Sequence, residues 1–503
     1  MKRRAFIQSA VVASTAGLMP RREALAAVFQ PAPQLPQEVE AITGVGQPVT
    51  LSGRALADLR ASLRGRLLLA GNEGYDEARR IRNPTFDKRP ALIVQPTGVA
   101  DIRTAVDFAR DNGGLLLAVK CGGHSFSGQS TCDRGMQIDL SLFRAVRVDP
   151  AARRAWVTGG SLLGQVDHET MPLGLVTTLG TVSHTGVGGL VTGGGFGRLG
   201  RRFGLSVDNV VAVDVVTADG QLRRASKDDE PDLFWGVRGG GGNFGIVTNF
   251  EFQLHPMQRQ VIAGPIVYPI SRAREGLQIY ADYAHVAPDE LNLNCGLGQQ
   301  PGTANSMFAF FVCYSGPATN LERAIAPIRK LGTPLADNLR AQDYVAVQRS
   351  GDVTDPRAQA TYLKSGFVPS IPVDLVNAIV DQFRGDPRRG GGVLLENVGG
   401  AIARVPADAT AFAQRDMHSN MLSTVAWRFG EEDGTEHVQW LRQYWAALEP
   451  FTYGFYVNNM SLDTTPAAIQ ANYRANQDRL VAVKNKYDPK NLFRLNANVK
   501  PTI

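Results

Sequence analysis

Cysteine is scarce in this chain of 503 residues. Its four cysteines (Cys121, Cys132, Cys295 and Cys313) are too few to staple a fold of this length with disulfides. None of them form a C-x-x-C pair, and no cluster of His and Cys has the spacing of zinc ligands. We therefore expect a hydrophobic core to hold the fold and no metal site. For Cys295 and Cys313 two readings stay open, a pair across a hairpin or two buried free thiols.

An excess of charge of one sign is also absent from most of the chain. The formal net charge is +6, of which residues 1–26 carry +4, so the other 477 residues carry only +2. Nucleic-acid binding requires a basic patch in the folded domain, and none is indicated. With 44% hydrophobic and 20% charged residues, the chain can bury a large core, and its length favours about three domains.

Long apolar runs are missing as well. The run from Ser9 to Met19 is much shorter than the roughly 20 residues that a membrane span needs, so we expect no membrane anchor. It follows the basic start Lys2-Arg3-Arg4 and precedes the small residues Ala24-Leu25-Ala26, which predicts a signal peptide over residues 1–26.

The paired arginines before Phe6 resemble a twin-arginine export signal, and an ordinary secretory signal is the alternative. The twin-arginine route exports folded proteins, often with their cofactor installed. The predictions are therefore an exported protein, periplasmic or secreted, with the export machinery as a partner and a bound cofactor.

The pattern along the chain divides it into four further segments. Residues 27–81 are expected to form an N-terminal segment with little chemistry, and residues 82–258 alternate short strands, glycine turns and helices. Within them, 101–112 is predicted as an amphipathic helix, 115–119 as a buried strand and 209–226 as a β-hairpin. Residues 259–429 read as a sheet with helices, and 430–503 as a helical tail.

Glycine, by contrast, is abundant: the chain has 53, and 17 of them lie within residues 180–245. Two segments, 195–200 and 240–245, match the pattern G-x-G-x-x-G. A Rossmann site requires that pattern between a strand and a helix, but the second match runs into a strand-like segment and the first follows more glycine. We interpret both matches as results of glycine density.

Successive glycines have another use, because bare backbone N–H groups can form a concave anion-binding nest. Residues 119–130 and 185–197 both have this composition. Two such loops, with neither a Walker lysine nor a Rossmann context, predict one extended pyrophosphate ligand.

Several ordered motifs then carry a family resemblance. They are Gly-Gly-His-Ser at 122–125, Gly-Val-Gly-Gly at 186–189, Arg-Gly-Gly-Gly-Gly-Asn-Phe-Gly at 238–245 and Tyr-Val-Asn at 456–458. Together they resemble the FAD-linked oxidases of the berberine-bridge-enzyme-like branch of the vanillyl-alcohol-oxidase superfamily.

The resemblance implies an α+β fold. It comprises a PCMH-type FAD-binding domain of two α/β subdomains at 82–258, a substrate domain with a large antiparallel sheet at 259–429, and a tail at 430–503 that completes the FAD domain. The implied activity is removal of hydride from an alcohol or amine C–H of a sugar or secondary metabolite, with O2 as acceptor and H2O2 as product. The alternatives are a dehydrogenase that passes electrons to a quinone or cytochrome, and a flavin-binding protein without turnover.

The resemblance also assigns residues to the cofactor. His124 would bond to the flavin 8α carbon, and Val182 stands where many relatives carry a second, cysteinyl attachment, so a single bond is expected. Thr185 occupies the position that controls oxygen access and is of the small, permissive type. The expected cofactor-binding residues are Gly122, Gly123, His124, Ser125, Gly128, Gln129, Val182, Thr185, Gly186, Gly188, Gly189, Gly194, Ile246, Val247, Tyr456, Asn458 and Asn496.

Both usual catalytic bases of the family are missing. Asn459 stands at the tyrosine position, and Asn420 or Met421 at the glutamate position. Three candidates remain: Tyr456 if its pKa is lowered, His418, and Glu396. An amine substrate, whose lone pair assists hydride loss, would need no strong base.

Overall fold

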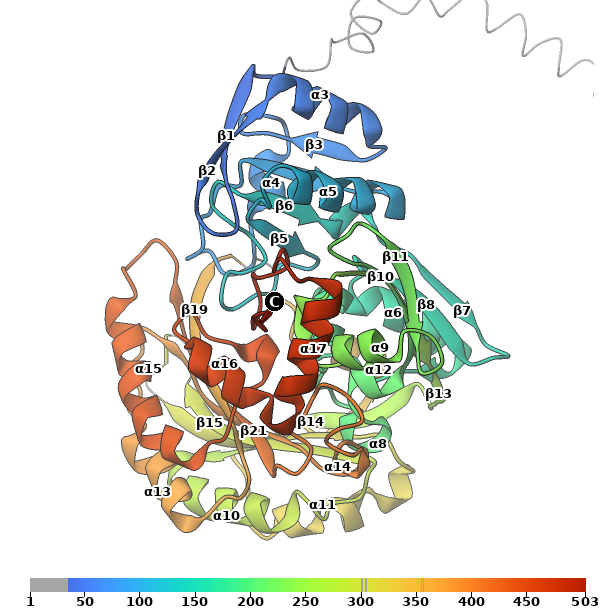
Figure 1. Ribbon diagram of the computed structural model, residues 1–503. Coiled ribbons are helices and arrows are strands. Elements are labelled where there is room, and N and C mark those ends of the chain that lie inside the picture. The colour runs from blue at the N-terminus through green and yellow to red at the C-terminus, as the bar shows by residue number, and fades with distance from the viewer. Residues whose placement is uncertain (1–34, 300–301, 304, 354, 356) are drawn as a thin grey trace, which may run out of the picture.

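The computed structural model describes residues 35–299, 302–303, 305–353, 355 and 357–503 (Figure 1). The predicted signal peptide lies outside these residues. The chain builds a first domain of two subdomains, a second domain around one large sheet, and a C-terminal segment that returns to the first domain (Figure 1).

The first subdomain is a four-stranded sheet covered by helices. Its strands run in the order β3 (Arg66–Leu68), β4 (Leu92–Gln95), β6 (Met136–Asp139) and β5 (Leu117–Lys120). Beside the sheet lie the hairpin β1 (Glu38–Ile42) and β2 (Pro48–Ser52), and the helices α3 (Gly53–Ser62), α4 (Tyr75–Arg79) and α5 (Val99–Asp111).

This subdomain confirms one expectation from the sequence and corrects another. Helix α5 confirms the amphipathic helix, since Ile102, Ala105 and Val106 are fully buried. Residues 35–81, expected as a separate segment, are part of the subdomain, because β3 pairs with β4 as an edge strand. The boundary at residue 82 was therefore wrong.

The second subdomain is an antiparallel five-stranded sheet. Its order is β11 (Leu222–Ser226), β10 (Val210–Val216), β12 (Ile246–Gln253), β8 (Arg154–Thr158) and β7 (Val146–Asp149). Strands β10 and β11 confirm the predicted hairpin. Strand β12 directly follows the second glycine match, which excludes a Rossmann helix there.

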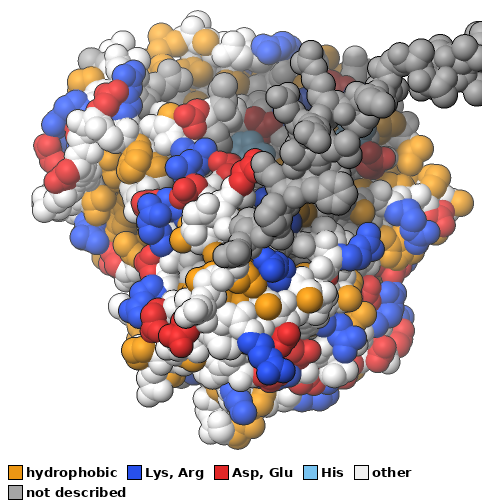
Figure 2. All heavy atoms as spheres, turned by 90° about the horizontal axis from the view of Figure 1, so that it is seen from above, with side chains coloured by type: hydrophobic (Ala, Val, Ile, Leu, Met, Phe, Trp, Pro, Cys, Tyr) orange, Lys and Arg blue, Asp and Glu red, His pale blue; other side chains and the backbone are white. Residues whose placement is uncertain are grey.

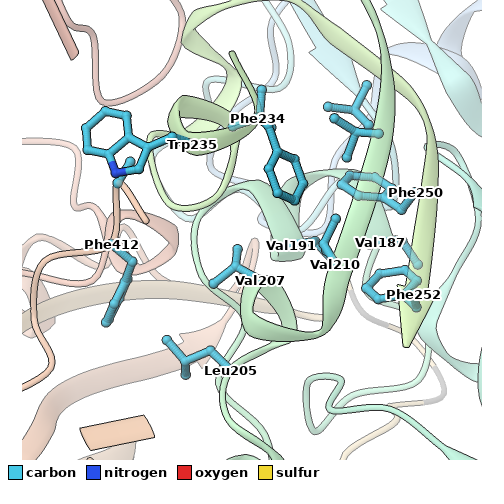
Figure 3. Close-up of a cluster of buried hydrophobic side chains, with 14 of the residues drawn as sticks. Val187, Val191, Leu205, Val207, Val210, Phe234, Trp235, Phe250, Phe252 and Phe412 are labelled. Atoms are coloured by element: carbon cyan, nitrogen blue, oxygen red, sulfur yellow. The ribbon is translucent and has the colours of Figure 1, made fainter. Parts of the chain in front are cut away.

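The short helix α7 (Val187–Thr192) shows how the core of this subdomain positions a glycine-rich segment. Val187 and Val191, one helical turn apart, point into a cluster with Val210, Phe250 and Phe252 (Figure 3). That packing fixes the helix and leaves its glycines on another face.

The second domain is an antiparallel sheet of eight strands. Its main order is β17 (Ala336–Asp337), β14 (Gln260–Pro269), β16 (Ser306–Tyr314), β15 (Leu291–Gln299), β20 (Gly390–Asn397), β21 (Ser419–Arg428) and β19 (Gln359–Val368), and β18 (Arg340–Asp343) also pairs with β14. One face is covered by α10 (Ala273–Tyr283), α11 (Leu321–Arg329), α13 (Val373–Gln382) and α15 (Thr435–Leu448) (Figure 1).

Helix α15 corrects a boundary. The sequence places 430–503 with the first domain, but Leu441, Tyr444, Trp445 and Leu448 of α15 are buried in the core of the second domain. The return to the first domain comes later, with α16 (Pro466–Asn472) and α17 (Gln477–Tyr487), which packs beside α9 (Pro231–Val237).

A buried lysine holds the C-terminal segment against the first domain. The Lys484 ammonium of α17 donates to the carboxylate of Asp488 at 2.6 Å and to the carbonyls of Asn243 and Phe493 at 2.8 and 2.9 Å. Because an ion pair buried this deeply is stable only when fully hydrogen-bonded, these contacts hold the tail against the 240–245 loop.

The molecular face in Figure 2 mixes positive and negative side chains without a one-signed patch. Within the described ranges, no helix combines the length and the hydrophobicity needed to cross a membrane.

Candidate cofactor and active site

A cavity of about 500 Å³ lies where the two subdomains, the large sheet and the tail meet. The first domain contributes the 121–130 loop, the 180–192 segment and the 241–247 loop. The second domain contributes Leu394, Glu396 and Leu422, and the tail contributes residues 456–460 and 493–497. The cavity thus joins segments that are far apart in the sequence.

Bare backbone forms one wall of this cavity. A side chain added at Gly189 or Gly241 would meet no atom within 4 Å, and one at Gly242 would meet only the Asn496 amide at 3.9 Å. These glycines therefore leave open space on the cavity side, as the close approach of a ligand to the main chain requires.

Buried polar atoms without hydrogen-bond partners also indicate a ligand in this cavity. The hydroxyl oxygen of Ser130 and the side-chain carbonyl of Asn496 are buried and have no hydrogen-bond partner in the described structure, and both residues line the cavity. Buried polar groups are nearly always satisfied, so these two fit a polar ligand. The glycine wall and the orphaned groups together suit the pyrophosphate and polar parts of FAD.

His124 sits in this wall with a neutral imidazole. Burial, aided by the nearby Arg82 guanidinium, lowers its pKa to about 3. Its Nε2 lies 2.7 Å from Nδ1 of His184, and its Nδ1 lies 3.3 Å from the Thr185 hydroxyl. A neutral ring with one nitrogen toward the cavity is chemically suited to attach to a ligand there.

Val182 and Thr185 both line the cavity beside His124. The nearest cysteine, Cys121, also lines it, but its thiol donates to the Gly159 carbonyl at 3.0 Å, and burial raises its pKa to about 11. A thiol so protonated is a poor nucleophile. The geometry fits one histidyl attachment and no cysteinyl one.

Tyr456 lies in the cavity wall, but as a neutral phenol. Its oxygen accepts hydrogen bonds from the Gly195 N–H at 2.9 Å and the Asn458 amide at 2.7 Å. Burial raises its pKa to about 12, whereas the base hypothesis required a lowered pKa. That hypothesis is wrong on this geometry, and Tyr456 instead packs edge-on against Phe196.

Glu396 is the carboxylate that the cavity presents. It projects from β20 and is paired in register with Asn420 of β21, whose amide donates to it at 2.8 Å. Burial raises its pKa above the usual value. The expected family glutamate position on β21 is therefore filled by Asn420, and the carboxylate stands one strand away on the same face of the sheet.

Side-chain alternation explains this assignment. Leu394 and Glu396 on β20, and Leu422 on β21, line the cavity, whereas Leu395 and Met421 are buried with the helices on the other face. Of the two residues expected at the family's glutamate position, Asn420 is therefore the one on the cavity face, and Met421 is not.

His418 is placed elsewhere. Its Nδ1 lies 2.8 Å from the Ser419 hydroxyl and its Nε2 lies 3.1 Å from the carbonyl of Ala281 on α10. Since α10 covers the opposite face of the sheet, His418 has no place in the cavity wall. Sequence reasoning missed this because it did not fix which residues of the strand face inward.

The remaining predicted cofactor residues divide in two. Those that line the cavity are Gly122, Gly123, Ser125, Gln129, Gly186, Gly188, Ile246, Val247 and Asn458. Gly128 and Gly194 do not: both have positive φ, and a side chain would strike the Phe86 ring at Gly128 and the Phe412 ring at Gly194. Their roles are conformational. Arg82, Gly241 and Gly242 also line the cavity but were not predicted, although the two glycines stand in the 238–245 motif that carries the resemblance.

Comparison with known proteins agrees with this architecture. Residues 90–226 match the model of an FAD binding domain, and residues 455–500 match that of the berberine and berberine-like segment. An FAD-linked oxidoreductase of Dictyostelium discoideum is 31% identical over 88% of this chain and 95% of its own length. The (R)-6-hydroxynicotine oxidase of Paenarthrobacter nicotinovorans is 31% identical over 88% of this chain and 97% of its own.

A solved structure shows the same fold. Glucooligosaccharide oxidase of Acremonium strictum, an enzyme with a 6-S-cysteinyl, 8α-N1-histidyl FAD, superimposes with a TM-score of 0.80 at 26% identity, covering 89% of this chain and 99% of that one. The matched segments, the full-length relatives and the cavity built from the same motifs agree, and the chain belongs to the berberine-bridge-enzyme-like FAD-linked oxidoreductases.

Proposed function

We propose that this FAD-linked oxidoreductase is an oxidase of an amine whose body is small and apolar. The observation that carries the proposal is Glu396, a carboxylate on the same face of the sheet as Leu394 and Leu422 in the cavity wall. The hydrogen bond from Asn420 does not offset the cost of burying this carboxylate, as its raised pKa reflects. A substrate ammonium beside Glu396 would offset that cost.

The residues divide the work as follows. When bound, FAD supplies the acceptor for two electrons from a substrate C–H bond. Glu396 binds the ammonium group and holds the proton that the amine must release before its lone pair can assist loss of hydride. Asn420 fixes the carboxylate through its amide, and the leucines exclude water from the ion pair.

The cofactor is proposed to be attached through His124 alone. Its neutral imidazole, the valine at position 182 and the protonated Cys121 thiol support this assignment. O2 is proposed as the electron acceptor, giving H2O2, because Thr185 is small at the cavity wall beside His124.

The deciding experiment is anaerobic reduction of the bound flavin. We expect 6-hydroxynicotine or a related cyclic amine to bleach the flavin absorbance and xylobiose to leave it unchanged. Bleaching by the sugar and by none of a panel of amines would overturn the amine assignment. Bleaching by an amine without reoxidation in air would replace the oxidase with a dehydrogenase, and no bleaching by any substrate would indicate a flavin-binding protein.

Export by the twin-arginine route is proposed from residues 1–26 alone. Because the receptor reads the guanidinium pair, Arg3→Lys together with Arg4→Lys should leave the precursor in the cytoplasm. An unchanged periplasmic yield in a fractionation experiment would point to the general secretory route.

A further inference from the structure

A second histidine, His184, stands directly behind His124. The Nδ1 of His184 lies 2.7 Å from the Nε2 of His124, and the two rings are 4.7 Å apart between centroids. His124 lines the cavity, whereas His184 is not among its lining residues. The contact therefore occupies Nε2 of His124 and leaves Nδ1 as the nitrogen on the cavity side.

His184 is backed in turn by a carboxylate from the second domain. Asp352, which follows α12 (Tyr344–Gln348), lies with Oδ1 4.0 Å from Nε2 of His184. That Nε2 is buried and has no hydrogen-bond partner in the described structure. The Ser183 N–H and hydroxyl donate to the two oxygens of Asp352 at 2.8 and 2.6 Å, which holds the carboxylate in place.

The charged groups around His124 and His184 favour transfer of a proton from His124 to His184. Burial acts to raise the pKa of Asp352, but the hydrogen bonds from Ser183 outweigh it and the net pKa is lowered, so the carboxylate is ionised. Burial is the main cause that lowers the pKa of both rings, and the pKa of His124 falls to about 3. Arg82 lowers both pKa values further, and Asp352 opposes these effects, most strongly at His184. A proton shared by the two rings is therefore more stable on His184.

We propose that His184 accepts the proton of His124 as the covalent bond to the flavin forms, and that Asp352 stabilises the resulting imidazolium. This inference rests on the proposed attachment at His124. The arrangement follows the general logic of a base oriented by a carboxylate, applied to cofactor attachment instead of turnover. The Thr185 hydroxyl lies 3.3 Å from Nδ1 and can donate to it in the tautomer that carries the proton on Nε2.

Formation of the covalent bond requires one oxidant, molecular oxygen. The new bond joins Nδ1 of His124 to the 8α carbon of FAD, and it replaces one N–H and one C–H bond. The two hydrogens and their electrons reduce the ring system, and molecular oxygen then removes them as H2O2. His184 carries the N–H proton on its way from His124.

The test measures covalent incorporation and not turnover. The full chain is produced under riboflavin limitation and mixed with FAD in air, and the flavin retained in the acid-precipitated pellet is followed with time. We expect His184→Ala to incorporate flavin about 100-fold more slowly than wild type. We expect Asp352→Asn to be several-fold slower and added imidazole to restore the rate of His184→Ala.

Two controls separate this role from a structural one. His168→Ala, at an exposed histidine of α6 (Leu163–Thr170), should incorporate flavin at the wild-type rate. In a His124→Ala background, where no bond can form, His184→Ala should leave the dissociation constant of FAD unchanged. Should His184→Ala bind no FAD, Asp352→Asn carries the test alone.

The outcomes are distinct. Release of all flavin from precipitated wild-type protein would overturn the attachment at His124 itself. A covalent wild type accompanied by equally fast incorporation in His184→Ala and in Asp352→Asn would overturn only the role of His184.

Discussion

The two ends of the cavity are built by different means. At the first-domain end, glycine backbone forms the wall, with Gly189, Gly241 and Gly242 leaving space that a ligand can enter. At the second-domain end, Leu394, Glu396 and Leu422 project from paired strands. The first end is defined by absent side chains, so any atoms added there would occupy the space left for a ligand. The second is specified by side chains on a rigid sheet, so its chemistry can change while its shape is kept.

Adding a side chain to the glycine end should give the largest effect. A Cβ added at Gly189 would meet no protein atom within 4 Å, and the position lies in a helix, so we expect Gly189→Leu to fold. The leucine would fill the space we assign to the cofactor, and flavin content should fall more than tenfold. Gly98→Leu is the matched control, since that glycine also has free space but lies outside the cavity lining. Normal flavin content in Gly189→Leu would break the comparison.

Changing the chemistry of the other end should spare the cofactor. Glu396→Gln keeps the shape and hydrogen bond to Asn420 but cannot take a proton, so anaerobic flavin reduction should slow by about 100-fold at unchanged flavin content.

The pH dependence should follow from the same carboxylate. A base works only when ionised, and burial raises the pKa of Glu396, so the wild-type reduction rate should increase with pH through a pKa above that of an ordinary glutamate. Glu396→Gln should lose that limb. Glu436→Gln, at an exposed glutamate of α15, should reduce its flavin as wild type does. Wild-type rates in Glu396→Gln would remove the carboxylate from the mechanism.

Thr185 lines the cavity beside His124, and once the flavin is attached its size should affect reoxidation and not substrate oxidation. Thr185→Leu adds bulk where close packing leaves little room, so reaction of the reduced enzyme with O2 should slow about tenfold. Thr185→Val keeps the size and should reoxidise as wild type does. Stopped-flow measurement of each half-reaction separates this effect from substrate oxidation. If Thr185→Leu reoxidises as fast as Thr185→Val, Thr185 has no role in oxygen access.

The smallest effect is expected where α6 of the first domain packs against α12 of the second. Asp167 of α6 is fully buried, and its pKa is raised to about 7, chiefly by burial. Between about pH 4 and 7 the folded state therefore holds a proton that the unfolded state has lost, so wild-type stability should fall as pH rises through this range. Asp167→Asn should remove that fall. The melting temperature of the variant minus that of wild type should therefore be a few degrees larger at pH 8 than at pH 5. A constant difference at both pH values would contradict the raised pKa.

The two ends also differ in how far they could be predicted. The glycine end was largely predictable, because motifs of contiguous residues such as 122–125 and 186–189 carry both the local backbone and its place on the cavity wall. The strand after Gly245 and the hairpin 209–226 were likewise local patterns. The omission there was narrow: Gly241 and Gly242 stand in the 238–245 motif that carries the resemblance, but they were not among the predicted cofactor residues.

The side-chain end depended on information that no local pattern holds. Which residues of β20 and β21 face the cavity is decided by pairing between strands, and a shift of one residue exchanges Asn420 for Met421. For that reason His418 was a reasonable candidate that the sheet directs to its other face, and His184 gave no signal at all. The domain limits at residues 82 and 430 failed similarly, since β3 and α15 belong to the sheets that they pack against and not to their neighbours in sequence.

The contact of Asp352 with Ser183 and His184 joins one domain to the other. If the bond to the cofactor depends on that carboxylate, a molecule whose second domain has not yet seated would hold its flavin only reversibly. The covalent bond would then serve as a chemical record of completed assembly, made once and kept. Under the export of the folded protein proposed above, such a record would separate finished molecules from unfinished ones before departure.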